Sequence, residues 1–409
     1  MSAEVFDYAG LLRPGLPPAA VKWNGFPKYN FVGGHNDADN VPVEGLIAAA
    51  TRVLRREGKT LAMYGLESGA QGYRPLREFT ARKLADTAGI ACSLDDILIT
   101  SGSLQGLDLV NQVLLSAGDT VIVEEMTYGG ALTRLQRLGV NIVGVPVDQD
   151  GLSTTRLEAA LTDLAQRGIK PKYIYTIPTV QNPTATVMSE ARRAQLLALS
   201  RTHGVPIFED ECYADLTWDG KRPRALRAMA GSDRVIHIGS FSKTIAPALR
   251  LGYLVAGWPL MSRILSVKSD AGSGALEQMV LAEYCQDAFD AHVSALRQTL
   301  RRKVDALIDA LRAQFGAAAE FDVPAGGIFL WVKLPATVDT SRLAQVALQA
   351  GVAINPGAEW MTDQTEGKRR LRICFAHPSE QTLREGVARL AQVCRSEFGV
   401  PAHSTDVHR

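Results

Sequence analysis

Residues 234–256 read RVIHIGSFSKTIAPALRLGYLVA and hold two short apolar runs, 234–238 and 252–255, with one lysine and one arginine in the segment between them. Upstream, similar runs alternate with segments of helical periodicity, which is typical of a layered α/β domain whose sheet is mostly parallel. Because the runs are almost continuously apolar, we expect strands that helices cover on both faces. With the upstream runs, the pattern predicts a seven-stranded sheet. These runs are 97–100, 120–123, 141–145, 173–176 and 205–208.

The sequence pattern changes after about residue 291. A long helical repeat at 292–315 is typical of a connector between two domains, and beyond it strand-like and helical segments alternate, which indicates a smaller α+β domain. The first 40 residues are rich in Pro and Gly and indicate an extended arm that crosses another surface. The predicted strands are 327–332 and 371–375, and the predicted helices are 341–350 and 380–398. The predicted division is an arm with part of the small domain at 1–55, a large domain at 56–295 and a small C-terminal domain at 296–409.

The composition is that of an ordinary globular chain, with 409 residues, 44 Lys and Arg against 43 Asp and Glu, and a formal charge of +1. This balance supplies no long-range field for a polyanion, and the sequence has no local basic patch, so we expect no nucleic-acid partner. The N-terminal residues lack a basic start and an apolar run, and no stretch reaches the roughly 18 apolar residues of a membrane span. These features predict a cytoplasmic protein without a membrane partner.

Five cysteines are scattered along the sequence, without a Cys-x-x-Cys pair and without a histidine at metal-ligand spacing. They predict reduced thiols and no metal site. Asp37 and Asp39 resemble the start of a calcium loop, but neither the glycine nor the terminal glutamate of such a loop follows.

Lys243 is placed at the end of one of the predicted strands, between small hydroxyl residues. A lysine at the end of a buried strand is poorly solvated, which lowers its pKa and favours a neutral amine that can form a Schiff base. The hydroxyls of Ser240 and Ser242, with the fork of Arg250, would suit a phosphate. The alternative is a lysine that simply emerges into a loop, and this segment alone leaves the two interpretations evenly balanced.

Asp210 directly follows another predicted strand. Ligands of open α/β sheets bind at the carboxyl ends of the strands, so Asp210 and Lys243 are expected to converge at one crevice. A carboxylate there can keep a heteroaromatic nitrogen protonated and so turn the ring into an electron sink. A helix-capping or ion-paired Asp210 is the alternative, and the neighbouring Glu209 and Glu211 are expected on solvated or ion-paired faces.

Three further segments have weaker signals of the same kind. The turn 100–105 opens a helix after a strand, a geometry that cradles phosphate, and it matches neither a P-loop nor a dinucleotide motif. Tyr128 would stack on a cofactor ring or pack in the core, and Asn182, before a proline, would bind a phenolic oxygen or only shape a turn. Arg372 lies within an apolar strand, where it needs an anion, either a substrate carboxylate or a structural salt bridge.

Together these segments resemble the class I/II pyridoxal-phosphate aminotransferases of the aspartate aminotransferase fold, which is fold type I. Within that family the sequence is most similar to the kynurenine/2-aminoadipate branch, over roughly residues 31–375. The joint order of the motifs is far more specific than any one of them. The motifs are Tyr64-Gly65, Ser101-Gly102-Ser103, Tyr128, Asn182-Pro183, Asp210-x-x-Tyr213, Ser240-Phe241-Ser242-Lys243 with Arg250, and Arg372.

The resemblance implies a role for each of these residues around pyridoxal 5′-phosphate. Lys243 would be the Schiff-base lysine and proton carrier, Asp210 the partner of the ring nitrogen, and Tyr128 the stacking residue. Asn182 and Tyr213 would bind the phenolic oxygen, and Tyr64 would reach the phosphate of the neighbouring subunit, so that a homodimer shares its active sites. The phosphate would be held by Ser103, Leu104, Ser240, Ser242 and Arg250, and the substrate α-carboxylate by Arg372 with Gly34 and Asn182.

The sequence departs from the family pattern at two places. Ala185 stands where the family usually has glycine after Asn-Pro-Thr, which concerns a turn more than the chemistry. Residues 33–39 read GGHNDAD where relatives commonly have Gly-Gly-Leu-Pro, and in the family this stretch borders the substrate side chain. His35 would therefore contact the substrate or belong to a surface loop.

The resemblance implies an enzyme that moves an amino group between an L-amino acid and a 2-oxo acid by a ping-pong mechanism. A lyase or decarboxylase at the same site is the alternative, because fold and cofactor leave open which bond at the α-carbon breaks. A regulator on this fold would carry a preceding helix-turn-helix domain, and the roughly 40 Pro-rich residues before the matching region argue against it.

The substrate side chain stays open. Arg13, Lys22 and Lys28 would favour a second carboxylate, unless they are only solvated surface charges. A set of aromatic residues would instead line an apolar pocket, although packing is the more common role of aromatic side chains. These residues are Trp23, Phe26 and Trp360.

Overall fold

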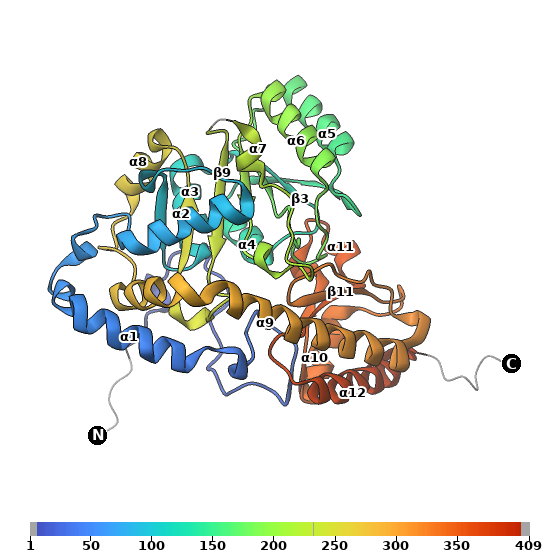
Figure 1. The fold of residues 1–409 in the computed structure, drawn as a ribbon. Coiled ribbons are helices and arrows are strands. Elements are labelled where there is room, and N and C mark those ends of the chain that lie inside the picture. Colours follow the sequence, from blue (N-terminus) through green and yellow to red (C-terminus); the bar gives the residue numbers. More distant parts are fainter. Residues whose placement is uncertain (1–5, 232, 402–409) are drawn as a thin grey trace, which may run out of the picture.

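The computed structural model describes residues 6–231 and 233–401, and its centre is a seven-stranded sheet in the order β2-β10-β9-β8-β7-β3-β4 (Figure 1). β10 runs antiparallel to both of its neighbours, and the other pairs are parallel. The sheet is thus mostly parallel, as the sequence predicts. Its strands are β2 (Ile97–Thr100), β3 (Thr120–Glu124), β4 (Asn141–Val145), β7 (Ile174–Thr176), β8 (Ile207–Asp210), β9 (Val235–Ser240) and β10 (Gly252–Val255).

Helices cover both faces of this sheet, which explains why its strands are almost continuously apolar. Alternate strand residues contact opposite layers, so that on β9 Val235 packs with α5, α6 and α7 while Ile236 packs with α3, α4 and α8. At the β2–β10 edge, α2 and α9 continue the first of these layers. The layer helices are α2 (Arg74–Ala88), α3 (Ser103–Leu114), α4 (Gly129–Arg137), α5 (Thr154–Gln166), α6 (Glu190–His203), α7 (Leu226–Ala230) and α8 (Trp258–Val267).

A second, antiparallel sheet in the order β11-β14-β13 lies in the C-terminal part of the chain, with α9, α10 and α12 against it (Figure 1). Residues 29–30 pair in parallel with 352–353, so the end of the N-terminal arm is joined to this part. The remaining elements are β1 (Tyr29–Asn30), β5 (Val147–Asp148), β6 (Gly151–Leu152), β11 (Phe329–Lys333), β12 (Val352–Ala353), β13 (Asn355–Pro356), β14 (Arg370–Cys374), α1 (Val43–Glu57), α9 (Ala275–Phe315), α10 (Thr340–Gln349), α11 (Gln364–Gly367) and α12 (Glu380–Phe398).

Helix α9 is 41 residues long and runs along both parts of the molecule (Figure 1). The prediction of a connector helix over 292–315 is correct in kind, but it places the start too late, since the helix begins at Ala275. The helix also passes through residue 295 without a break. The boundaries at 55/56 and 295/296 therefore stay a proposal.

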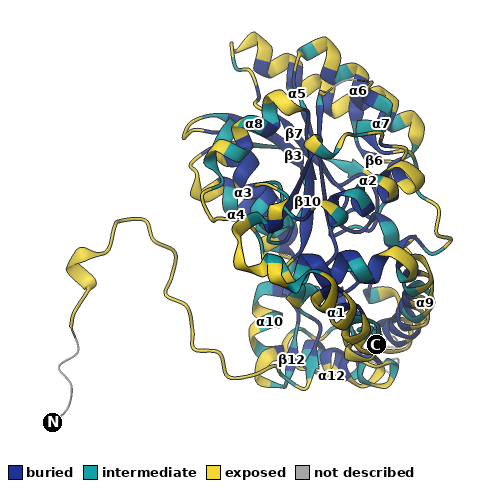
Figure 2. Ribbon diagram, turned by 60° about the vertical axis from the view of Figure 1, so that its left-hand side comes forward, coloured by how far each residue is buried: buried dark blue, intermediate teal, exposed yellow. Residues whose placement is uncertain are grey.

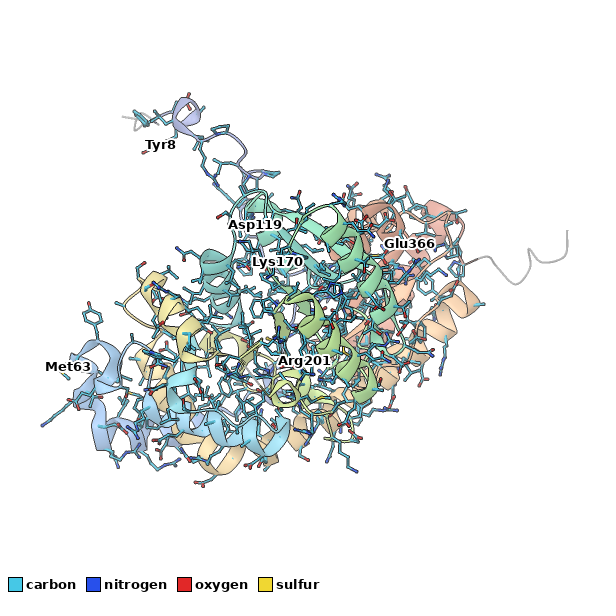
Figure 3. All side chains as sticks on the ribbon, turned by 90° about the horizontal axis from the view of Figure 1, so that it is seen from above. Tyr8, Met63, Asp119, Lys170, Arg201 and Glu366 are labelled. Carbon is cyan, nitrogen blue, oxygen red and sulfur yellow. The ribbon has the colours of Figure 1, made fainter. Side chains whose placement is uncertain are left out.

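The N-terminal arm, residues 6–28, extends away from the body of the chain, and almost all of its residues are exposed (Figure 2). In the view from above, Tyr8 lies well beyond the body and Met63 lies at one edge of it (Figure 3). Within the described residues, no helix has the length and apolar character needed to cross a membrane.

Candidate active site

Lys243 lies in the loop that follows β9, with its side chain directed at the N-terminal segment. Its Nζ donates a hydrogen bond to the carbonyl of Gly34 at 3.1 Å. A Cβ at residue 34 would lie 2.5 Å from this nitrogen, so a glycine leaves the room that the lysine needs. Burial lowers the pKa of Lys243, as predicted for a lysine at the end of an apolar strand.

Asp210 ends β8, and its carboxylate is buried. The phenol of Tyr175 donates to Oδ2 at 2.7 Å, and the amide of Cys212 donates to Oδ1 at 3.2 Å. Burial raises the pKa of Asp210, and these hydrogen bonds oppose the shift. Asp210 and Lys243 line one cavity of about 650 Å³, so the predicted convergence at the carboxyl ends of the strands is seen.

One end of this cavity has the composition of an anion site. Helix α3 begins at Ser103, next to Gly102 with φ +75°, and the hydroxyl residues Ser240 and Ser242 line the same space. Arg250, itself at φ +55°, donates to the carbonyl of Ser101 at 3.2 Å. Its guanidinium occupies the place that a Cβ at Gly102 would need, so the glycine allows the arginine to close over the helix start.

Three other buried side chains that line this cavity form a hydrogen-bonded group. Arg372 Nη1 donates to Asn182 Oδ1 at 3.1 Å, and Asn182 Nδ2 donates to the phenol oxygen of Tyr213 at 3.4 Å. Tyr213 is held from behind by Phe329, edge to face at a centroid distance of 5.0 Å. All four side chains come from different elements, so only the folded chain assembles them.

Arg372 lies on β14, and only 4% of its surface is exposed. It has no carboxylate partner among the described residues, where its hydrogen bonds go to Asn182 and to the carbonyl of Gly33 at 3.2 Å. The guanidinium carbon lies 3.7 Å from the ring centre of Trp360, and Nε has no hydrogen-bond partner. A structural salt bridge is therefore not found, and the charge is placed to receive an anion from the cavity.

Tyr128 and Leu104 also line the cavity, as predicted. The ring of Tyr128 is tilted against Trp360 at a centroid distance of 6.0 Å. A Cβ at Gly130 would lie 2.5 Å from the Tyr128 ring, so this glycine gives the ring its position over the cavity.

Tyr64 is the predicted site residue that one chain does not bring to this cavity. Its side chain is 91% exposed and borders a separate hollow of about 280 Å³, which the segment 268–273 also lines. Its role stays a prediction, because that role was assigned to the cavity of a neighbouring subunit.

Glu209 on β8 and Glu211 directly after it flank Asp210 and point to the opposite face of the sheet. Glu209 binds His237 Nδ1 at 2.9 Å, and Glu211 lies 3.1 Å from Arg222 and 3.4 Å from Arg193. The prediction of ion pairing is correct for both, but a solvated face is wrong, because both carboxylates are fully buried and need these partners.

The segment 33–39 also differs from a metal loop. Asp37 pairs with Lys303 at 2.6 Å and caps a short helical turn, and His35 packs its ring near His377 and Phe26. Among residues 6–231 and 233–401, no group of three or more His, Cys, Asp or Glu side chains is placed to hold a metal ion.

Several cavity residues carry no sequence motif that would single them out. Tyr175 looks like an ordinary residue of a buried strand, and its bond to Asp210 depends on the pairing of β7 with β8. Cys212 and Asn355 also line the cavity without a motif that marks them. Asn355 is a neighbour of Arg372 because β13 and β14 pair these two residues. Trp360 was one of the aromatic residues considered for an apolar pocket, and it does line the cavity.

A buried lysine, a carboxylate at the neighbouring strand end, an anion cradle and a buried arginine in one crevice define a site for a cofactor and an anionic substrate. The sequence matches the family "Aminotransferase class I and II" over residues 29–390, and the chain belongs to this family. It is a pyridoxal-phosphate-dependent aminotransferase.

Two similar proteins are named as aminotransferases, and a third is named as a transcriptional regulator. An aromatic-amino-acid aminotransferase of Thermococcus litoralis is 31% identical over 372 residues, which are 90% of this chain and 88% of that protein. The structure of an α-aminoadipate aminotransferase from Thermus thermophilus, complexed with N-(5′-phosphopyridoxyl)-L-leucine, superimposes with a TM-score of 0.82 at 30% identity, covering 91% of this chain and 93% of the other. An uncharacterized HTH-type transcriptional regulator of Bacillus subtilis is also similar, at 33% identity over 80% of this chain, and the chain spans 66% of that protein.

The residues of the cavity fit pyridoxal phosphate on their own chemistry. The helix start at Ser103 with Arg250 and two serines suits a dianionic phosphate, and Lys243 is a buried amine within the same space. Asp210 provides an anion next to which a ring nitrogen would keep its proton.

Proposed function

We propose that Lys243 is the amine to which the cofactor is attached and the group that carries the proton during amino transfer. The observation that carries this proposal is that Lys243, Asp210 and Arg372, an amine, a carboxylate and a guanidinium, line one cavity. Arg372 is proposed to bind the α-carboxylate through two parallel hydrogen bonds, with Asn182 and the Gly33–Gly34 segment beside it.

The side chains divide the chemical work. When bound, pyridoxal phosphate supplies an electron sink for the α-carbon of the amino acid. Lys243 would take the proton from the α-carbon and return it to carbon C4′ of the cofactor, which its lowered pKa favours because the neutral amine is the base. Asp210 keeps a proton on the ring nitrogen, and the phenol of Tyr175 stabilises that carboxylate. Since amino donor and oxo acid use the one cavity in turn, we expect ping-pong kinetics.

The other cofactor contacts follow the shape of the cavity. Ser103, Leu104, Ser240, Ser242 and Arg250 are proposed to hold the phosphate, and Tyr128 to stack on the ring. Asn182 and Tyr213 are proposed to bind the phenolic oxygen, which their mutual distance of 3.4 Å supports.

We further propose a homodimer whose subunits share their active sites. Large apolar side chains are exposed on α1 and the segment after it and along the arm, which a monomer would leave in water. They include Phe6, Tyr8, Trp23, Phe26, Val43, Ile47, Leu61, Met63 and Tyr64. In the dimer Tyr64 would bind the phosphate of the partner's cofactor.

A cytoplasmic location is proposed on the five free thiols alone, and cell fractionation tests it.

For the amino donor, we propose an apolar or aromatic side chain. Apart from residues proposed to hold the cofactor, the described cavity lining includes the apolar Trp360, Met361, Ile177 and Leu132, and Arg372 is its only cation. The polar side chains of the lining include one carboxylate, which would repel a second carboxylate of the substrate; they are Thr133, Gln136, Asn355, Glu359 and Gln364. Arg13, Lys22 and Lys28 are exposed on or next to the arm and do not line this cavity. The test is a panel of aromatic, branched, alanine, glutamate and 2-aminoadipate donors against pyruvate, 2-oxoglutarate and glyoxylate. A preference of tenfold or more for dicarboxylic donors would contradict this proposal.

The replacement of Lys243 by Ala tests the central assignment. We expect Lys243→Ala to lose the cofactor absorbance band of the attached form and at least 10²–10⁴-fold of the turnover, roughly what a proton carrier contributes. Lys170→Ala, which removes an exposed lysine, serves as control. Full turnover of Lys243→Ala with an unchanged absorbance band would refute the assignment.

The lyase or decarboxylase alternative is tested by product balance. Transamination yields one new amino acid for each 2-oxo acid formed from the donor, so their ratio should be about one. Release of CO₂ or of a β-substituent without this stoichiometry would show that another bond at the α-carbon is broken.

A further inference from the structure

One buried carboxylate near the cavity has no part in the chemistry above. Glu124 ends β3 with no exposed surface. Burial raises its pKa to about 7, against the hydrogen bonds of Thr176, Gln181 and Ile177. The side chain of Glu124 accepts hydrogen bonds from neutral groups and has no cationic partner among the described residues. Burial of such a carboxyl group costs folding free energy, so the groups that it binds indicate its role.

Every side-chain hydrogen bond of Glu124 holds the segment that leads to the cavity. The Thr176 hydroxyl donates at 2.5 Å, the Ile177 amide donates at 3.2 Å, and Gln181 Nε2 donates at 3.0 Å. Thr176 and Ile177 fix the end of β7, and Gln181 is the residue directly before Asn182.

Gln181 in turn closes the turn that carries Asn182. Its amide oxygen accepts from the Thr184 amide at 2.8 Å and from the Thr184 hydroxyl at 2.7 Å, and its own backbone amide donates to the Thr186 carbonyl at 2.9 Å. The side-chain nitrogen Nε2 of Gln181 also donates to the Met126 carbonyl at 2.5 Å. The side chain of Gln181 therefore uses both its nitrogen and its oxygen to hold the turn against β3.

The turn presents Asn182 with its two polar atoms directed at different groups. Asn182 Oδ1 accepts from Arg372 at 3.1 Å, while Nδ2 donates to Tyr213 at 3.4 Å. A rotation of the turn would move both contacts at once, including the one that Asn182 makes with the guanidinium of Arg372.

We propose that Glu124 and Gln181 are positioning residues that hold Asn182, and through it Arg372, in the geometry for binding a substrate carboxylate. The proposal rests on the function assigned to Arg372 above. The titratable groups that act on Glu124 are Asp210 on β8 and Tyr175 on β7, which also belong to the cofactor side. Protonation of Glu124 would occupy an oxygen that accepts from the turn, so the geometry should loosen as the pH falls through the pKa of Glu124.

The test uses the holoenzyme with Glu124→Gln, Gln181→Ala and the double variant. The amide of Gln at residue 124 fills the same space as the carboxylate. Its NH₂ group would face the NH₂ group of Gln181, and two donors cannot form a hydrogen bond with each other. We expect the KM for the amino acid to rise about 5- to 10-fold with little change in kcat, since roughly one hydrogen bond is lost. The double variant should be no worse than the poorer single variant, because both remove the same contact.

A matched control separates positioning from general stability. Tyr173→Phe deletes another buried side-chain hydrogen bond, 2.7 Å to Asn111, on the residue just before β7 and away from the cavity. We expect it to lower Tm as much as Glu124→Gln does and to leave KM, the cofactor Kd of the apoenzyme and the pH profile unchanged. Glu124→Gln should instead weaken pyridoxal phosphate binding a few-fold and remove the acid-side fall of kcat/KM near pH 7.

Two outcomes are distinguishable. If Arg372→Ala raises KM while Glu124→Gln and Gln181→Ala change only Tm, the positioning proposal is wrong and the proposed function stands. If Arg372→Ala itself leaves KM unchanged, the role assigned to Arg372 fails, and the positioning proposal fails with it.

Discussion

Arg372 is a charge that the fold keeps inside a strand without a carboxylate partner among the described residues. Burial lowers its pKa, and Trp360 covers one face of the guanidinium. Burial of an unpaired charge is costly, and an anion that binds from the cavity would offset this cost, which supports the role proposed for Arg372 as the receptor of the substrate carboxylate. Substitution of Arg372 should therefore weaken substrate binding far more than it lowers the stability of the protein.

The replacement of Arg372 by Lys tests this view at the residue scale. Lysine keeps the positive charge but cannot form two parallel hydrogen bonds or stack on the indole. We expect Arg372→Lys to reduce kcat/KM for the amino acid about 10²-fold, and Arg372→Ala about 10³-fold, from the loss of roughly 3–4 kcal/mol of charge-assisted hydrogen bonding. Steady-state kinetics measure it, with the exposed Arg201→Lys as control. A loss below threefold in Arg372→Lys would contradict bidentate binding.

The buried amine of Lys243 gives a pH prediction. Cofactor capture requires the neutral amine, whose fraction rises with pH through the pKa of the lysine. Because burial lowers that pKa from its usual 10.5, capture by the apoenzyme should approach its maximum at a pH below 10.5. Stopped-flow absorbance between pH 6 and 10 measures the rate. A rate that still rises tenfold per pH unit up to pH 10 would show a solvated lysine instead.

At the scale of elements, the turn 181–186 combines polar contacts with an unusual backbone. Ala185 has φ +60° and is buried at the place where the family usually has glycine. Its amide donates to the Gln181 carbonyl at 2.5 Å, so the left-handed conformation is part of the turn. The short methyl group tolerates this conformation, and a branched side chain would not.

Two substitutions test how strongly this turn depends on residue 185. Ala185→Gly relieves about 1–2 kcal/mol of strain but loses a buried methyl group and gains unfolded-state freedom, so we expect less than about 1 kcal/mol of net change. Ala185→Val should destabilise the protein by about 2 kcal/mol or more. Urea unfolding measures both. A several-fold change in KM for Ala185→Gly would show that the departure from the family pattern concerns the chemistry.

The elements themselves were predictable because their signals are local. All seven strands of the large sheet begin and end within two residues of the apolar runs, and Ser189 caps α6 through the Arg192 amide. Asp210 and Lys243 could be placed together because parallel strands end at one edge. The roles of Glu124 and Tyr175 could not be predicted, because their hydrogen-bond partners lie on other elements. Their contacts depend on which strands pair in the sheet, and the local sequence does not show this. The early start of α9 was missed for the same reason, since its first turns pack against α1 and α2.

At the scale of the whole molecule, the chain is nearly neutral in sum, and its informative charges are the few that are buried. Most ion pairs are on the surface and contribute little. Around β8, buried charges lie on two sides of the strand, with Asp210 on the side of the cavity, and with Glu209, Glu211, Arg193 and Arg222 on the opposite side. The second group is internally paired, whereas Asp210 has no cationic side chain paired with it among the described residues and faces the cavity.

The arm and Tyr64 also concern the whole molecule, because both are exposed in a single chain and would find contacts only in an assembly of two chains. If two subunits share each site, Lys243→Ala and Tyr64→Ala damage the same cavity from different chains. Each variant alone should be strongly impaired. After the two are mixed, dissociated and reassociated, about half of the dimers are mixed, and each mixed dimer has one intact cavity and one doubly damaged one. We therefore expect about a quarter of the wild-type activity, well above the mean of the two separate variants. Activity that stays at that mean, although mass spectrometry detects mixed dimers, would show that Tyr64 acts within its own chain or not at all.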